Sequence, residues 1–233
     1  MSEPLSFVLT EEAGILTLTM SAPGNNLMTG AFFQEYEAVM EQIQSRSTQP
    51  GIRGLIIRGG GRHFSVGADV DALGERSARE PFDGVHLPPS HCRQKQLFTF
   101  LRSLPFPVVS VVTGFCIGSG SEIAVNSHYR ICEKNARVGQ PESTFGILPA
   151  LGGVARTIEL CGMSAAYRLV MSGELIPAET AYALGWADLL CDKKQGYARA
   201  VELIDWISGH CENFSGADWG QLLRQYLNEG ANT

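Results

Sequence analysis

The chain has 233 residues, of which 44% are hydrophobic and 18% charged, a composition typical of a globular protein with a self-sufficient core. Its net charge of −6, with no run of Lys and Arg, argues against a nucleic-acid partner, because phosphates require clustered cations. Its six cysteines form no C-x-x-C pair and no zinc-ligand spacing with histidine, so we expect reduced thiols and no metal.

The sequence shows no sign of export or of a membrane span. Residues 1–5 lack the basic and apolar regions of a signal peptide. The longest apolar stretch, residues 108–117, is interrupted by Ser, Thr and Gly and is far shorter than the roughly 20 residues of a membrane span. We therefore expect a cytoplasmic protein without a membrane partner.

Hydrophobic periodicity and turn residues predict strands that alternate with helices. The predicted strands are residues 5–9, 15–20, 54–57, 108–112, 130–132, 136–139 and 188–191. The predicted helices are a helix capped by Thr29 that carries apolar residues from Phe32 to Ile43, then residues 69–73, 92–104, 118–126, 154–161, 165–172 and 177–184, and one or two helices in 197–227. Residues 74–90 show no period and are predicted to be a mobile loop. The alternation predicts an α/β fold with mostly parallel strands.

Two turns rich in small residues follow predicted strands. The segment from Gly114 to Glu122 lacks a G-K-[ST] motif, and Ile123 stands where a dinucleotide fingerprint needs its third glycine. What this turn offers is a helix N-terminus with unpaired N–H groups, which can stabilise a developing oxyanion. The turn from Phe64 to Asp69 could supply a second donor.

Two carboxylates accompany these turns. Glu122 alone would be an ordinary helix residue, and Glu142 alone would be a first-turn residue favoured by the helix dipole. Two neighbouring carboxylates raise the pKa of at least one of them, so that one can hold a proton near neutral pH. Two acids with two sets of N–H donors indicate acid/base chemistry beside a carbonyl group.

In order and spacing, these segments resemble the crotonase (enoyl-CoA hydratase/isomerase) superfamily. The resemblance is carried by the segments Phe64–Asp69, Gly114–Glu122 and Gly139–Glu142, with Gly146, Pro149 and Gly152–Gly153, by Pro23–Leu27, and by Ser172–Gly173 with Ala178, Ala181, Gly185 and Asp188. It implies an α/β fold built as a spiral of ββα units over residues 1–192, with a short helical C-terminal region over residues 193–233. It also implies a homotrimer or a dimer of trimers.

The resemblance further implies a thioester substrate whose carbonyl oxygen lies between the backbone N–H groups of Ala68 and Ser119. Glu122 would activate a water for attack at Cβ, and Glu142 would exchange the proton at Cα. The implied substrate-binding residues are Leu27, Val66, Gly67, Asp69, Gly118 and Gly120. No cofactor is implied beyond coenzyme A as part of the substrate, and fatty acid metabolism is the implied context. Because both glutamates are present, hydration is favoured over isomerisation.

Several alternatives stay open. They are an enoyl-CoA isomerase, a dehydratase or decarboxylase acting on acyl-carrier-protein thioesters, and a non-catalytic oligomeric scaffold. A serine protease of the related Clp fold would need Ser119 or Ser121 with His128, and would leave both glutamates unexplained. Typical relatives continue some tens of residues further and cover the adenine end of coenzyme A, so the resemblance does not supply the trimer contacts, the coenzyme A contacts, or both. We expect His86 and His91 to be solvated loop residues, and His63 to be structural.

Overall fold

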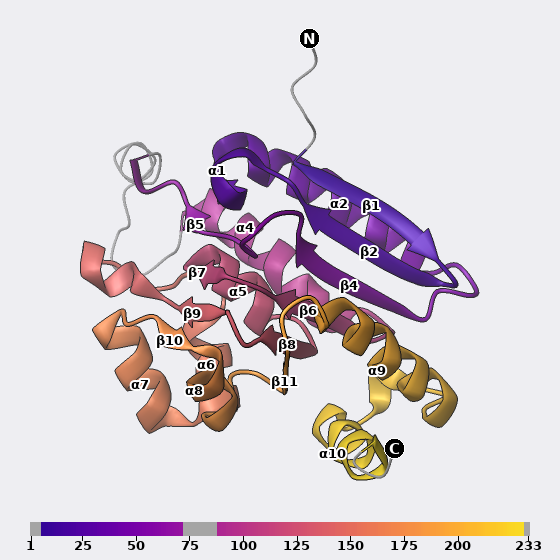
Figure 1. The fold of residues 1–233 in the computed structure, drawn as a ribbon. Helices are drawn as coiled ribbons and strands as arrows, with labels where there is room; N and C mark the ends of the chain where they lie inside the picture. The colour runs from indigo at the N-terminus through magenta and orange to yellow at the C-terminus, as the bar shows by residue number, and fades with distance from the viewer. Residues whose placement is uncertain (1–5, 72–87, 231–233) are drawn as a thin grey trace.

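The computed structural model describes residues 6–71 and 88–230 of the chain, and its centre is a six-stranded sheet (Figure 1). The strand order is β1-β2-β4-β6-β8-β11, and the strands are β1 (Phe7–Glu12), β2 (Ile15–Met20), β4 (Gly54–Gly59), β6 (Val108–Val112), β8 (Tyr129–Glu133) and β11 (Leu189–Cys191). Only the β1–β2 hairpin is antiparallel, and the other neighbours pair in parallel. The predicted α/β fold with mostly parallel pairing is confirmed.

Both faces of this sheet are covered, which explains the continuous apolar sequence of its middle strands. Successive side chains point to opposite faces, so Leu55 and Ile57 join one apolar cluster while Ile56 joins the other. The first cluster includes α2 (Gly30–Ser47) and α5 (Ser119–Val125), and the second includes α9 (Gly196–His210). In Figure 1, α2 lies behind the sheet and α9 lies in front of it.

Two smaller sheets carry the turns that the sequence analysis singled out. Strands β10, β9 and β7 form one of them, with bounds Ile176–Pro177, Arg137–Gly139 and Phe115–Ile117. Strands β3 (Leu27–Met28) and β5 (Gly67–Ala68) form the other, in parallel. Of these short strands only β9 falls on a predicted strand. Strands β3, β5 and β7 lie where the sequence predicted turns or made no prediction, and β10 includes Pro177, the predicted first residue of a helix that begins at Ala178.

The remaining helices follow the predicted order. They are α4 (Pro89–Thr99) with η1 (Phe100–Ser103), η2 (Pro141–Phe145), α6 (Gly153–Cys161), α7 (Met163–Ser172), α8 (Ala178–Ala183), η3 (Phe214–Gly216) and α10 (Trp219–Gly230). The predicted cap of α2 is confirmed, since the Phe32 N–H donates to Thr29 Oγ1 at 3.3 Å. The short element α1 (Pro23–Asn26) is a turn in which Gly24, Asn25 and Asn26 all have positive φ.

Two predictions need correction. The first strand occupies Phe7–Glu12 and not residues 5–9, because it pairs along its whole length with β2. The predicted loop ends earlier than residue 90, because α4 begins at Pro89, a residue suited to the first helical turn. The rest of that loop, including His86, and the end of the predicted helix 69–73 lie outside the described residues. No helix in the described part of the chain has the length and apolar character of a membrane span.

Candidate active site

The N-terminus of α5 is built by a sharp turn at Gly118, whose φ of 55° and ψ of −129° suit glycine. The Gly118 N–H donates to Gly139 O of β9 at 3.0 Å, which joins the turn to the segment that leads into η2. Ser119 is the first helical residue, and N–H groups in this first turn have no acceptor within the helix. All of α5 is buried, so this donor lies in a protein environment where its dipole is poorly screened.

The second turn packs directly onto the first. A Cβ at Gly67 would lie 2.7 Å from Ile117 O and 3.5 Å from Gly118 Cα, so only glycine allows this approach. The Asp69 N–H donates to Met28 O of β3 at 3.2 Å. Because successive N–H groups of an extended strand point to opposite sides, the Ala68 N–H points away from β3. The two predicted oxyanion donors therefore lie on two turns that touch each other.

A buried polar pair fixes the Gly67 turn. Ser65 Oγ donates to Asn26 O at 2.7 Å and accepts from the Gly67 N–H at 3.0 Å. Asn26 Nδ2 donates to Phe64 O at 3.0 Å. A Cβ at Gly120 would lie 2.7 Å from Ser65 Cβ, so Gly120 brings α5 against this turn by packing.

Glu122 is almost fully buried, with 1% of its surface exposed, and its carboxyl group is held by backbone. Oε1 accepts from the Leu151 N–H at 2.7 Å and from the Gly153 N–H at 3.0 Å. Leu151 belongs to the turn before α6, and Gly153 is the first residue of α6. With Oε1 occupied in this way, Oε2 is the oxygen left for a proton or a water.

Glu142 approaches the same place from η2. A Cβ at Gly118 would lie 3.3 Å from Glu142 Oε1, which places this carboxyl group against the start of α5. Its other oxygen, Oε2, is buried and has no hydrogen-bond partner. An unpartnered buried acceptor is costly in free energy, which is typical of a group that awaits a ligand.

Burial makes both carboxyl groups weak acids. Desolvation, with the negative charge of Glu142 adding to it, raises the pKa of Glu122 to about 8, while the Gly153 and Leu151 N–H groups and Lys95 oppose the rise. Desolvation raises the pKa of Glu142 to about 7. The pair therefore holds one proton near neutral pH, so it contains an acid and a base together.

The other predicted residues fall around this centre. Leu27 pairs with Gly67 across β3 and β5, and the Val66 N–H donates to Asn25 O. Asp69 lies at the end of β5 and is partly buried. The structure thus gathers the predicted residues of segments that are far apart in the sequence.

His128 is not part of this centre. Its Nδ1 accepts from the Val108 N–H at 3.0 Å, its Nε2 lies 3.2 Å from Arg102 O, and burial lowers its pKa to about 3. Both ring nitrogens are engaged by backbone, which removes the base that a protease with Ser119 or Ser121 would need. His63 is structural as predicted, because its ring stacks on Phe115 and its Nδ1 accepts from the Phe115 N–H.

Sequence reasoning missed Gln140, a buried residue whose amide and the carboxyl group of Glu122 both lie against Gly153. A Cβ at Gly153 would lie 2.5 Å from Gln140 Nε2 and 2.9 Å from Glu122 Oε1. Both amide atoms of Gln140 lack a partner, and so does Thr157 Oγ1. Gln140 and Thr157 line a cavity of about 10 Å³, the size of one water. The only signal in the sequence was its place in the Gly139–Glu142 segment.

No metal site accompanies these groups within residues 6–71 and 88–230, where no three His, Cys, Asp or Glu side chains gather as ligands would.

Comparisons with known proteins identify the family of this chain. The family model described as enoyl-CoA hydratase/isomerase matches residues 10–214. A probable enoyl-CoA hydratase of Bacillus subtilis (strain 168) is 32% identical over 171 residues, which are 73% of this chain and 63% of that protein. The 2,3-dehydroadipyl-CoA hydratase of Escherichia coli (strain K12) is 28% identical over 179 residues, 76% of this chain and 66% of that protein.

The chain thus matches a little under two thirds of the length of these two relatives. Among solved structures, Pseudomonas aeruginosa DspI superposes with a TM-score of 0.77 at 22% identity, over 100% of this chain and 83% of that chain. This likeness supports the fold. Because the family model spans most of the sequence, the chain belongs to the enoyl-CoA hydratase/isomerase family.

Proposed function

We propose that the protein hydrates a 2-enoyl thioester to the 3-hydroxyacyl thioester, with Glu122 and Glu142 as its acid/base pair. The observation that carries the proposal is the convergence of these two buried carboxyl groups at the start of α5, beside two turns with backbone donors. The names of the matched relatives support coenzyme A as the carrier of the acyl group.

The backbone turns would stabilise the enolate. Attack on Cβ moves the π electrons of the double bond onto the thioester oxygen, and this charge needs donors that are already in place. The N–H groups of Ala68 and Ser119 would provide them. Losing one such donor typically costs about 2.7–4 kcal/mol of transition-state stabilisation.

The glutamates would then move the protons. In hydration, ionised Glu122 takes a proton from water as its oxygen bonds to Cβ, and protonated Glu142 gives its proton to Cα. Elimination of water starts from the opposite arrangement, with Glu142 ionised and Glu122 protonated. A pKa difference of one unit is about 1.4 kcal/mol, so the proton can occupy either member at small cost.

A pair of glutamates favours hydration over isomerisation. Moving a double bond requires one group that removes a proton and returns it, whereas adding water requires a second group to deprotonate the nucleophile. Glu122 suits this second role because two backbone donors hold its Oε1 and leave Oε2 for the water.

Replacement of each glutamate by glutamine tests the proposal. We expect Glu122→Gln to reduce hydration of crotonyl-CoA at least about a hundredfold, as is usual for a lost general base, while exchange of the Cα proton partly survives. We expect Glu142→Gln to lose both reactions. Loss of the absorbance of the conjugated thioester measures hydration, and deuterium uptake at Cα of butyryl-CoA, whose Cα protons are acidic, measures exchange.

The matched control is Glu41→Gln, which neutralises an exposed carboxylate of α2 and should leave both rates unchanged. Equal hydration by Glu122→Gln and the parent would contradict the assignment and would favour an isomerase. A parent that turns over no enoyl thioester on either coenzyme A or a carrier protein would favour a scaffold. The homotrimer or dimer of trimers, the carrier-protein alternative and the cytoplasmic location stay predictions.

A further inference from the structure

A buried amide at the end of α5 connects the helix of Glu122 to the turn that holds the Glu122 carboxyl group. Asn126 follows the last residue of α5 and has no exposed surface. Its Nδ2 donates to Glu122 O at 2.8 Å and to Leu151 O at 3.2 Å. Both acceptors are backbone carbonyl oxygens, so the amide must present its nitrogen to them and not its oxygen. One side chain thus binds both segments that define the position of Glu122.

These hydrogen bonds form a closed ring. The Leu151 N–H donates to Glu122 Oε1 at 2.7 Å, while the Leu151 carbonyl accepts from Asn126. Leu151 is therefore held at both of its backbone polar groups, by Glu122 and by the residue one helical turn further along α5. Asn126 fixes the turn that carries the N–H donor, and this donor fixes the carboxyl group.

Gly152 allows the turn to approach this amide closely. Its φ is 101°, and a Cβ at this position would lie 3.2 Å from Asn126 Nδ2 and 3.4 Å from Asn126 Oδ1. Glycine suits both the backbone conformation and the contact. The residues on either side of Gly152 are the two backbone donors to Glu122 Oε1. The amide therefore packs against the centre of the segment that holds the carboxyl group.

The contact between α5 and α6 does not depend on this amide. Arg156 of α6 donates from Nε to Val125 O at 2.9 Å, next to Asn126 on α5. Asn126 Oδ1 is buried and has no hydrogen-bond partner among the described residues. An unpaired buried acceptor offsets part of the free energy that the two Nδ2 bonds gain. Loss of the amide should therefore be a local change that leaves the fold intact.

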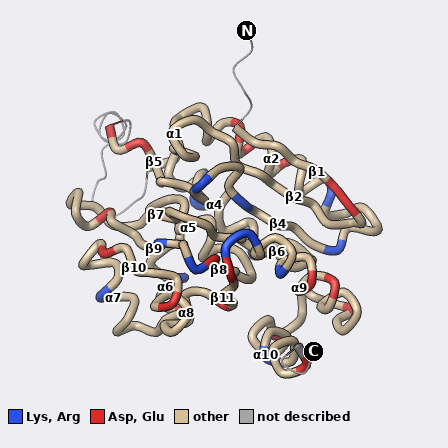
Figure 2. Tube along the Cα trace, viewed as in Figure 1, with Lys and Arg blue, Asp and Glu red and all other residues tan. Residues whose placement is uncertain are grey.

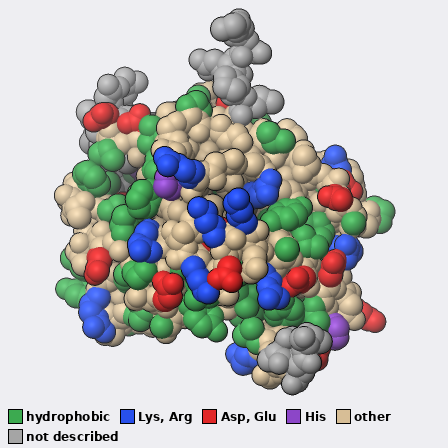
Figure 3. Space-filling view, in the orientation of Figure 1, with side chains coloured by type: hydrophobic (Ala, Val, Ile, Leu, Met, Phe, Trp, Pro, Cys, Tyr) green, Lys and Arg blue, Asp and Glu red, His purple; other side chains and the backbone are tan. Residues whose placement is uncertain are grey.

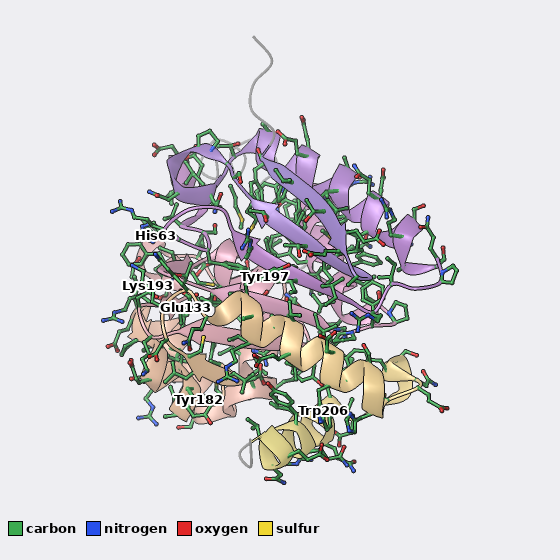
Figure 4. All side chains as sticks on the ribbon, turned by 45° about the vertical axis from the view of Figure 1, so that its right-hand side comes forward. His63, Glu133, Tyr182, Lys193, Tyr197 and Trp206 are labelled. Carbon is green, nitrogen blue, oxygen red and sulfur yellow. The ribbon has the colours of Figure 1, made fainter. Side chains whose placement is uncertain are left out.

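The main gathering of surface cations does not include this ring of hydrogen bonds. Lys and Arg segments gather over the ends of β4, β6 and β8 in Figure 2, and basic side chains surround the middle of the same face in Figure 3. They line an open cleft, where Lys193 and Glu133 lie near each other in Figure 4. The charges with the largest effect on the pKa of Glu122 are instead Glu142 of η2 and Lys95 of α4. A variant of the amide leaves all these charges in place.

We propose that Asn126 is a positioning residue for hydration, which keeps the Glu122 carboxyl group directed at the water by holding the Leu151 turn. This role rests on the proposed function, in which Glu122 is the base and Glu142 is the acid. Because Asn126 has no exposed surface, it acts through Glu122 and not on the substrate. A displacement of about 1 Å at a reacting group can cost about a hundredfold in rate, so a fixed carboxyl group matters for the reaction.

Removal of the two amide donors tests the proposal. We expect Asn126→Leu to lower kcat for hydration of crotonyl-CoA at least about tenfold and to leave KM unchanged. Exchange of the Cα proton of butyryl-CoA, which is assigned to Glu142, should survive. Asn126→Ala lacks the same donors but leaves space where leucine fills it, and it should give the same pattern. Equal loss of hydration and exchange in both variants would indicate a merely structural role and would overturn the proposal.

The protonation of Glu122 gives a second readout. The Leu151 N–H lowers the pKa of Glu122, against the desolvation and the Glu142 charge that raise it to about 8. When the turn is released this donor is weakened, so the pKa of Glu122 should rise and the alkaline limit of hydration should move to higher pH. NMR titration of isotope-labelled glutamate carboxyl groups measures this pKa without turnover, and the spectrum of Glu122→Gln assigns the resonance. An unchanged pKa in Asn126→Leu would overturn the proposal.

The matched control is Ser127→Ala, one residue further along the chain. Ser127 is equally buried, and its Oγ donates to Ile123 O at 3.3 Å and lies 2.8 Å from Ser110 Oγ. The control removes a buried polar side chain from the same end of α5, but its hydrogen bonds do not involve the Leu151 turn. It should leave both reactions and the pH profile unchanged. The same loss of hydration in Ser127→Ala as in Asn126→Leu would mean that any change at this helix end suffices, and would overturn the proposal.

Failure of this proposal can be distinguished from failure of the proposed function. If the parent hydrates no enoyl thioester, the proposed function fails, whereas a raised pKa of Glu122 in the Asn126 variants still supports Asn126 as the residue that positions this carboxyl group. If the parent hydrates and both Asn126 variants match it in kcat and in the pKa of Glu122, only the positioning role fails. Circular dichroism verifies that all variants are folded.

Discussion

At the scale of single residues, the candidate site depends on two carboxyl groups that burial turns into weak acids. Glu122 is held by two backbone donors, whereas Glu142 leaves an oxygen without a partner. This difference in hydrogen bonding separates their roles better than their pKa values do. The residue with a fixed oxygen can orient a water, and the residue with a free one can exchange a proton with substrate.

The coupled pair predicts a bell-shaped pH dependence of kcat/KM for hydration. Hydration requires that the two glutamates together carry one proton. The pKa values of about 7 and about 8 bound the pH range in which they do so. Below this range both groups are protonated and no base remains. Above it both are ionised and no acid remains. Initial rates from pH 5.5 to pH 9.5 measure the profile, and a flat profile would contradict a coupled pair.

At the scale of elements, the start of α6 completes the site through Gly153. A Cβ at this position would meet Gln140 Nε2 at 2.5 Å and both Cγ and Oε1 of Glu122 at 2.9 Å. The backbone N–H of the same residue donates to Glu122. The approach of α6 to α5 therefore fixes the carboxyl group from two sides.

We expect Gly153→Ala to shift Glu122 and reduce hydration at least about tenfold, with a loss of about 1–3 kcal/mol in the free energy of unfolding. The matched control is Gly209→Ala in α9, where a Cβ would meet nothing within 4 Å. This control should keep its activity and gain up to about 1 kcal/mol of helix stability. Hydration rates and urea denaturation measure both effects. Full activity in Gly153→Ala would show that the tight contact is not needed.

The sequence predicted the long elements well because their apolar residues show either a helical period or a continuous run. Helix α2 shows apolar residues at helical spacing, and β4 and β6 are continuous apolar runs. Strands such as β3 and β5 have two residues each and show no period, so only tertiary pairing defines them. The donors that hold Glu122 come from Leu151 and Gly153, and no local pattern indicates this contact.

The charge pattern of the whole molecule was also hidden in the sequence. Arg58, Arg62, Arg137, Lys193 and Lys194 line one open cleft, but they come from separate strand ends and from the turn after β11, so no basic run appears along the chain. The fold gathers them because parallel strands bring their carboxyl ends to one edge. Composition argued against a nucleic-acid partner, and it gave no sign of this local gathering of cations.

The whole fold also sets how stability depends on pH. His128 is buried neutral between β6 and η1, with its pKa lowered from 6.5 to about 3 by burial. Below pH 6.5 the His128 ring is protonated in the unfolded chain but stays neutral in the folded chain. The free energy of unfolding therefore decreases as pH falls from 6.5. Glu122 acts in the opposite sense, because its pKa is raised from 4.5 to about 8. The contribution of Glu122 to the free energy of unfolding is therefore fully present below pH 4.5 and is lost as pH rises towards 8.

Between pH 4.5 and pH 6.5 the two residues therefore oppose each other, and single variants should separate them. Relative to His128→Gln, the parent should lose up to about 1.4 kcal/mol for each pH unit below 6.5. Relative to Glu122→Gln, it should lose a similar amount for each unit above 4.5 until about pH 8. Urea denaturation at pH 4.5, 6.5 and 8 measures these slopes and is unaffected by constant differences in stability between variants. Parallel slopes for the parent and Glu122→Gln would mean that Glu122 titrates normally in the fold, and would remove the basis of its role as an acid/base group.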